Sequence, residues 1–95
     1  MEIVWSQTAV RRVEEISKFI AKDSPQAASR FIGRLIRSVE RLKKFPLSGS
    51  AVPENIAFRQ VVFQRYRIVY RLTGTAVQIV TVVSPGFSSD DSLKK

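Results

Sequence analysis

The sequence contains no cysteine and no histidine. Without cysteine the chain forms no disulfide, and the usual zinc site of cysteine and histidine ligands is excluded. Without histidine it lacks the commonest general base near neutral pH. The sequence also has no glycine-rich phosphate loop and no paired carboxylates. Any catalysis would therefore depend on arginine, lysine, tyrosine or a single carboxylate, and we expect neither a metal nor a cofactor.

Long apolar runs are absent as well. The first five residues show no basic segment followed by an apolar stretch, and no run approaches the roughly 20 residues that span a bilayer. We therefore expect a cytoplasmic protein that does not contact a membrane.

Acidic residues are scarce relative to basic ones. The 95 residues include 8 Asp and Glu but 16 Lys and Arg, which gives a formal charge of +8. This balance favours an anionic partner such as nucleic acid, the ribosome or an acidic protein segment. The alternative is a protein that is basic without such a partner. The length predicts a single domain over residues 1–95 with a modest core, so a partner that covers apolar surface would add to its stability.

The first half of the chain predicts a strand and two helices. Residues 3–5 form a short β-branched and aromatic run, and Ser6 can cap the helix that follows. Ser24 and Pro25 mark the start of a second helix, which ends before Pro46. Since the link is short, the helices should form an antiparallel hairpin. The apolar face expected on the first helix consists of Val10, Val13, Ile16 and Ile20.

The second half predicts three strands over residues 58–63, 66–72 and 76–83, after a loop over residues 47–55. Gln64-Arg65 and residues 73–75 are short enough to be hairpin turns. The expected class is α+β, in the order β-αα-βββ, with the helical hairpin packed on a mostly antiparallel four-stranded sheet. We expect residues 84–95 to form a mobile tail.

The expected pairing separates two faces of this sheet. If Gln64-Arg65 is a two-residue turn, Phe63 pairs with Tyr66 and Val62 with Arg67. The face toward the helices should carry Val61, Phe63, Tyr66, Ile68, Tyr70, Leu72, Val77, Ile79 and Val83. The other face should carry Phe58, Gln60, Val62, Arg67, Val69, Arg71, Gln78, Val80 and Val82. An apolar face with two arginines indicates a partner surface, or one covered by the tail or a second subunit.

Eight arginines are candidates for binding a partner. Four form a stripe on the second helix, at spacings of four, three and four residues: Arg30, Arg34, Arg37 and Arg41. Four more cluster around the central hairpin: Arg59, Arg65, Arg67 and Arg71. Arginines on rigid strands can hold phosphates and stabilise developing charge. The alternatives are a solvated helix face for the stripe and a structural role, opposite Tyr70, for Arg59.

The order of several short motifs resembles the RelE/ParE superfamily of toxins from bacterial type II toxin–antitoxin systems, also called plasmid-stabilisation proteins. These motifs are Val4-Trp5 before a helix, Asp23-Ser24-Pro25-Gln26-Ala27-Ala28, Phe45-Pro46-Leu47-Ser48-Gly49 and Tyr66-Arg67-Ile68-Val69-Tyr70-Arg71. The resemblance covers residues 3 to about 83, and the fold that it implies has the element order given above.

The resemblance implies two possible activities. RelE-like members cut mRNA in the ribosomal A site with basic residues, and Arg67 falls on one catalytic arginine of that branch. The other basic positions of that set fall on Phe58, Gln60 and near Phe87, none of which is basic. ParE-like members, which inhibit DNA gyrase, are more similar in the Asp-Ser-Pro helix start and in the Phe-Pro-Leu-Ser-Gly loop.

Three hypotheses follow. The chain is a ParE-like toxin that inhibits DNA gyrase by binding, an RelE-like ribosome-dependent mRNA endoribonuclease in which Arg67 stabilises the transition state, or a non-toxic member that binds only an antitoxin. The acidic, serine-rich segment over residues 84–91 motivates the third. All three predict a cognate antitoxin, within a hetero-oligomer or beside a homodimer. Its C-terminal segment should cover the helical hairpin or the sheet, near Arg30, Arg34, Arg37 or Arg67.

Overall fold

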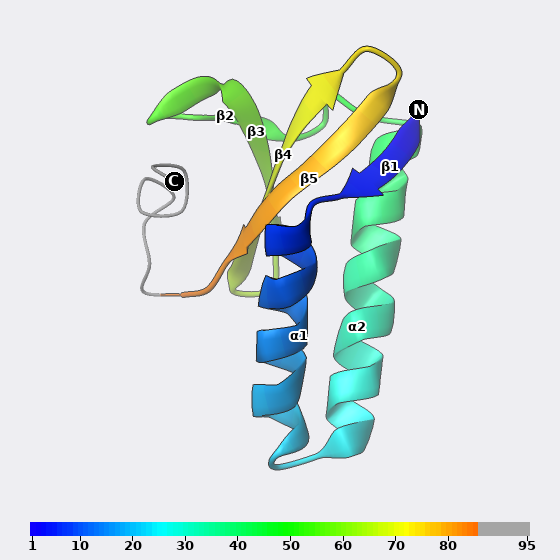
Figure 1. Ribbon diagram of the computed structural model, residues 1–95, viewed down its shortest axis with the longest axis vertical. Helices are drawn as coiled ribbons and strands as arrows, with labels where there is room; N and C mark the ends of the chain where they lie inside the picture. Colours follow the sequence, from blue (N-terminus) through cyan, green and yellow to red (C-terminus); the bar gives the residue numbers. More distant parts are fainter. Residues whose placement is uncertain (86–95) are drawn as a thin grey trace.

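The structure is a computed structural model that describes residues 1–85. Its two helices pack on one five-stranded sheet, with the strand order β1-β5-β4-β3-β2 (Figure 1). The elements are β1 (Glu2–Trp5), α1 (Gln7–Ala21), α2 (Pro25–Glu40), the 3-10 turn η1 (Arg41–Lys43), β2 (Ser50–Val52), β3 (Asn55–Phe63), β4 (Tyr66–Thr73) and β5 (Ala76–Val83). Only β1 runs parallel to its neighbour, β5. The expected α+β class is confirmed, with one strand more than predicted.

Both helices begin at the expected serine caps. The hydroxyl of Ser24 accepts a hydrogen bond from the amide of Ala27 (3.1 Å), and Pro25 occupies the first turn. The hydroxyl of Ser6 accepts from the amide of Ala9 (3.0 Å) and donates to the carbonyl of Val80 (2.7 Å). Ser6 therefore caps α1 and also attaches its start to β5.

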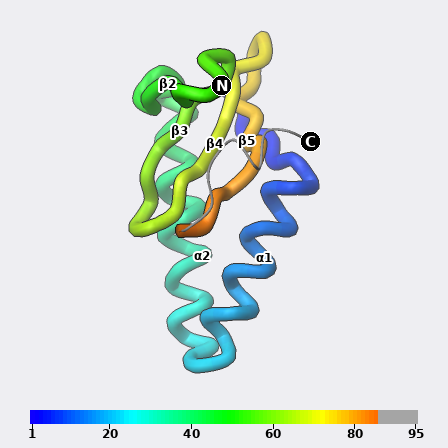
Figure 2. Tube along the Cα trace, turned by 90° about the vertical axis from the view of Figure 1, so that its left-hand side faces the viewer, coloured from blue at the N-terminus to red at the C-terminus, as the bar shows by residue number. Residues whose placement is uncertain are grey.

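The helical hairpin lies on one side of the sheet, and its tip projects past the sheet (Figures 1 and 2). On α1 the buried stripe includes Ala9 and Ile16, whereas Val10 is 44% exposed. The expected face was therefore wrong at Val10. Ala9 lies four residues before Val13 and seven before Ile16, so it completes the stripe at helical spacing, and its small side chain gave little signal.

The main core fills the space between the hairpin and the sheet. Its buried members are Ala9, Ile16, Phe31, Leu35, Val39, Leu42, Ile68, Tyr70, Val77, Ile79 and Val82. The ring of Phe31 meets the edges of Phe63 and Tyr66, with centroid distances of 5.6 and 5.3 Å. Such edge-to-face contacts add to the burial of apolar area, so Phe31 fixes α2 against the β3–β4 hairpin.

The turn between β3 and β4 has the expected register. Phe63 pairs with Tyr66 and Val62 with Arg67, and Gln64 adopts a φ of 55° to close the turn. The next turn is one residue tighter than expected. Thr73 pairs with Ala76, which leaves Gly74 and Thr75 as the loop, and Gly74 has a φ of 52° that favours glycine.

A β-bulge in β5 changes the face of its last residues. Val69 pairs with Thr81, but Tyr70 pairs with Ile79, so Val80 is an extra residue. One extra residue shifts the alternation of the strand by one position. As a result Val82 lies opposite Ile68 in the core, and Val83 lies on the other face. The faces predicted for Val82 and Val83 were therefore wrong.

The second face of the sheet is partly covered by β2, which lies within the predicted loop. A strand of three residues is too short to show alternation, so β2 could not be predicted from the sequence. Val52 of β2 is fully buried and packs in a second cluster with Val69 and Val83, against which Phe58 and Val80 also pack. Among the described residues β2 thus covers part of this face, and Val62 remains 71% exposed on it. The mobile tail predicted for residues 84–95 lies, from residue 86 on, outside the described residues.

Within residues 1–85 no helix has both the length and the apolar character needed to cross a bilayer.

Candidate binding surfaces

The central tyrosine of the sheet holds the loop that follows α2. The hydroxyl of Tyr70 accepts a hydrogen bond from the amide of Gly49 (2.9 Å) and donates to the carbonyl of Pro46 (2.8 Å). The turn itself is closed by the amide of Ser48, which donates to the carbonyl of Phe45 (3.1 Å). A Cβ atom on Gly49 would lie 2.5 Å from the Tyr70 hydroxyl oxygen, which is closer than real contacts allow. The motif over residues 45–49 and the motif over residues 66–71 therefore meet at the hydroxyl of Tyr70.

Arg59 belongs to this loop contact. It pairs in register with Tyr70, and its Nη1 atom donates to the carbonyls of Gly49 (2.7 Å) and Leu47 (3.3 Å). Its guanidinium thus satisfies loop carbonyls that would otherwise need water. These contacts agree with the structural role that was one of the alternatives for Arg59.

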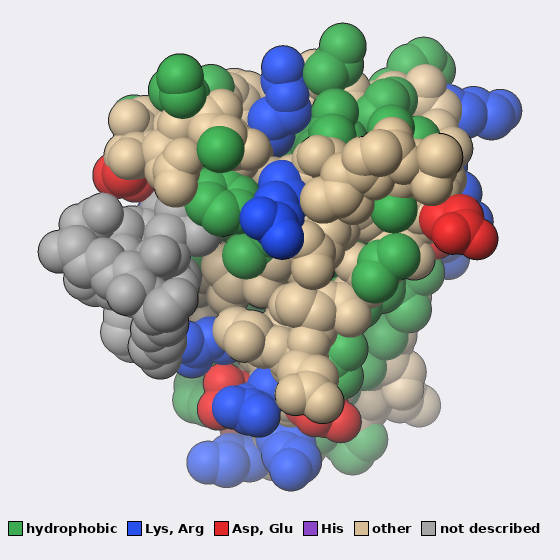
Figure 3. Space-filling view, turned by 45° about the horizontal axis from the view of Figure 1, so that its top comes forward, with side chains coloured by type: hydrophobic (Ala, Val, Ile, Leu, Met, Phe, Trp, Pro, Cys, Tyr) green, Lys and Arg blue, Asp and Glu red, His purple; other side chains and the backbone are tan. Residues whose placement is uncertain are grey.

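The remaining three arginines of the predicted cluster do not converge on one point. The Nε atom of Arg71 donates to the side-chain oxygen of Gln78 (2.6 Å). Arg67 is half-buried and lies in register between Val62 and Val83. Arg65 occupies the β3–β4 turn and borders a cleft beside α1. On the face seen in Figure 3, basic side chains stand singly at the top and in the centre, and several gather beside acidic ones at the lower edge.

The positions at which the RelE-like branch carries further basic residues hold neutral side chains in this chain. Phe58 belongs to the second apolar cluster, and the side-chain oxygen of Gln60 is buried without a hydrogen-bond partner among the described residues. Glu54 lies exposed in the β2–β3 turn. Phe87, Asp90 and Asp91 fall outside the described residues. Among residues 1–85 no three His, Cys, Asp or Glu side chains come together as a metal site.

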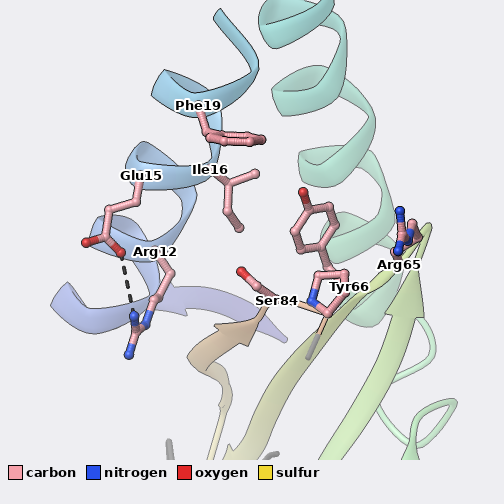
Figure 4. A pocket seen from close by; sticks show the side chains of 8 residues that line it. Arg12, Glu15, Ile16, Phe19, Arg65, Tyr66 and Ser84 are labelled. Carbon is pink, nitrogen blue, oxygen red and sulfur yellow. Dashed lines mark ion pairs between the residues drawn. The ribbon is translucent and has the colours of Figure 1, made fainter. Parts of the chain in front are cut away.

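An open cleft of about 410 Å³ separates α1 from the start of β4. Ile16 and Phe19 project from α1 toward the ring of Tyr66, and Phe19 is 70% exposed (Figure 4). Arg12 lies 3.6 Å from the carboxylate of Glu15 on one side, and Arg65 lies on the other. We refer to this feature as the α1 cleft. It combines an apolar floor with charged walls, as protein-binding pockets do.

The arginine stripe borders two grooves. One groove, of about 280 Å³, lies between the two helices and the β3–β4 turn and includes Arg30, Arg34 and Gln64 in its lining. The other, of about 530 Å³, includes Arg41, Phe45 and Gln60. All four arginines of the stripe are exposed, as the helical spacing predicted. We refer to the stripe and the two grooves together as the α2 seam.

Two exposed aromatic residues on these surfaces were not predicted as binding residues. Phe19 and Phe45 are 70% and 61% exposed. For Phe19 the exposure could have been expected, because this residue lies outside the apolar stripe of α1.

These surfaces belong to a chain with clear relatives. Residues 3–85 match the model of a family described as the ParE toxin of the type II toxin-antitoxin system, parDE. The chain belongs to the ParE family of type II toxins. A protein of Sinorhizobium fredii named "Putative toxin Y4kP" is 38% identical over 84 residues, which span 85% of this ParE-family chain and 84% of that protein.

Two solved structures share the fold of this ParE-family chain. One is the chromosomal ParDE toxin–antitoxin system of P. aeruginosa, with a TM-score of 0.78 and 18% identity over 90% of this chain and 96% of that one. The other is the toxin–antitoxin complex RelBE2 of Mycobacterium tuberculosis, with a TM-score of 0.60 and 21% identity over 87% of this chain and 95% of that one. The resemblance to the RelE/ParE superfamily, and to its ParE branch, is therefore confirmed.

Proposed function

We propose that this ParE-family toxin acts in the cytoplasm by binding DNA gyrase, and that a cognate antitoxin neutralises it within a hetero-oligomer. The family match supports the toxin role. Both structural relatives are toxin–antitoxin systems, which supports an antitoxin partner by analogy.

The observation that carries the choice of binding over cleavage is the residue types at the positions where the RelE-like branch has basic side chains. An arginine can stabilise a transferring phosphate, but strand cleavage also needs groups that move protons. Here one of those positions is Phe58, which packs against an apolar cluster, and another is Gln60, whose side-chain oxygen is buried. Neither side chain can move a proton, which supports inhibition by binding.

Gyrase supercoiling in the presence of the purified chain tests this proposal. We expect loss of supercoiling as the chain is titrated against gyrase, and the same loss with Arg67→Gln in place of the wild type. A chain that leaves supercoiling intact at a large excess over gyrase would refute the gyrase target. Cleavage of mRNA on translating ribosomes, lost in Arg67→Gln, would instead establish the endoribonuclease.

The α1 cleft is the surface that we propose for the antitoxin. Its floor of Ile16, Phe19 and Tyr66 offers the apolar anchor that protein interfaces require, and Arg65 at its wall fits an acidic side chain. Burying the exposed Phe19 ring would contribute roughly 2 kcal/mol.

Affinity for the antitoxin of the same operon tests this assignment. Phe19→Ser should raise the dissociation constant at least about tenfold, because it removes an anchor worth more than 1.4 kcal/mol. Ile56→Ser, at an exposed apolar residue of β3 that lines neither the α1 cleft nor the α2 seam, is the matched control. Equal affinities for the wild type and Phe19→Ser would place the antitoxin elsewhere, with the arginine stripe as the next candidate.

A further inference from the structure

The α2 seam has a regular arrangement of positive charge. The helical rise of about 1.5 Å per residue spreads the stripe from Arg30 to Arg41 over about 16 Å. The guanidinium groups follow one line along α2 because their spacings of four and three residues keep them on one helix face. The two grooves lie along this line, one near each end of the stripe.

This positive charge is uncompensated within the described part of the chain. No acidic side chain lines either groove. The nearest candidate, Glu40, forms an ion pair of 2.8 Å with Lys43. Since Arg12 makes the only other ion pair among residues 1–85, all four arginines of the stripe lack an internal carboxylate partner.

The groove beside Arg41 adds two further kinds of group. The hydroxyl-bearing residues Ser38, Ser48 and Ser50 line it, and such groups commonly bind phosphate oxygens and sugars. Phe45 lines it as well, with 61% of its surface exposed. An exposed ring beside arginines provides a stacking platform for an unpaired base.

We propose that the α2 seam binds single-stranded nucleic acid, with backbone phosphates along the arginine stripe and a base stacked on Phe45. This interaction goes beyond the inhibition of gyrase and does not depend on it. An acidic protein segment would pair with the same arginines but brings no base to stack on Phe45, although Leu42, Val61 and Val62 also line the groove beside Arg41. A duplex fits less well too, because its paired bases cannot stack on a side chain.

Fluorescence anisotropy with a labelled oligonucleotide of about twelve nucleotides tests the proposal on the purified full chain. Four phosphate contacts predict a plot of log K against log salt with a slope of about −3, since each contact to a single strand contributes about 0.7. The double variant Arg34→Gln with Arg37→Gln should make that slope about 1.4 shallower. Arg11→Gln with Lys18→Gln, which removes the same charge from exposed positions on α1, should leave it unchanged.

Phe45 separates a nucleic acid from other polyanions. Phe45→Ala should weaken binding about tenfold, and Phe45→Tyr should restore it because the tyrosine ring also stacks. Circular dichroism of each variant shows that the fold is kept.

Three results would overturn the proposal. One is tighter binding of the duplex of the same sequence. Another is equal affinity for the oligonucleotide and for poly-glutamate of the same charge. That result would assign the seam to an acidic protein. The third is equal loss of affinity in the α1 control and in the stripe variant.

Discussion

Arg59 of β3 and the arginines of the α2 seam carry the same charge on elements that border the same groove, but their surroundings differ. The guanidinium of Arg59 donates to two carbonyls of the loop after α2. The four arginines of the stripe are exposed and form no ion pair within the described chain. One arginine thus serves the fold and the others remain available to a partner. The contrast shows that net charge alone does not identify a binding surface.

The largest effect that sharpens this comparison is expected at Gly49. Gly49→Ala should destabilise the chain by about 3 kcal/mol, because the new Cβ would lie 2.5 Å from the Tyr70 hydroxyl oxygen and 2.8 Å from the carbonyl of Gln60. Urea unfolding measures the change. Gly33→Ala is the control, since a Cβ there meets nothing within 4 Å, and it should stabilise α2 by about 0.5–1 kcal/mol. A neutral Gly49→Ala would show that the loop is not held as described.

A smaller loss is expected when the tyrosine loses its hydroxyl. Tyr70→Phe should lower the free energy of unfolding by about 2 kcal/mol, because a buried amide and a carbonyl each lose a hydrogen-bond partner. Tyr66 is half-buried and lines the α1 cleft, and Tyr66→Phe should change the free energy of unfolding by less than about 0.5 kcal/mol. Equal losses in the two variants would contradict the special role of Tyr70.

The smallest change in the free energy of unfolding is expected at the two kinds of arginine themselves. Arg59→Gln should destabilise the chain by about 1 kcal/mol through the lost contacts to the loop. Arg34→Gln, at an exposed position of the stripe, should change the free energy of unfolding by less than about 0.5 kcal/mol. Thermal or urea unfolding of the two variants under identical conditions provides the measurement, and equal losses in the two variants would remove the distinction between structural and available arginines.

Much of the fold was predictable from local chemistry. The caps Ser6 and Ser24 and the two-residue turn at Gln64-Arg65 depend on neighbouring residues only, and all are confirmed. The register of β3 and β4 followed from that turn. The motifs of the Phe-Pro-Leu-Ser-Gly loop and the central strand also pointed to the correct family.

What the sequence could not show depends on contacts between distant residues. The bulge at Val80 leaves no mark in an apolar run, yet it reverses the faces of Val82 and Val83. β2 is visible only through its pairing with β3 and the burial of Val52. For the candidate surfaces, the stripe on α2 followed from helical spacing, but the role of Arg59 required the position of the loop.

The most direct test of the central claim, a toxin that acts by binding, is induction of the chain without its antitoxin in growing bacteria. DNA supercoiling and mRNA integrity should be measured in the same cultures. We expect arrested growth, relaxed plasmid DNA and intact mRNA. Cleaved mRNA with normal supercoiling, or unimpaired growth with both readouts normal, would contradict it.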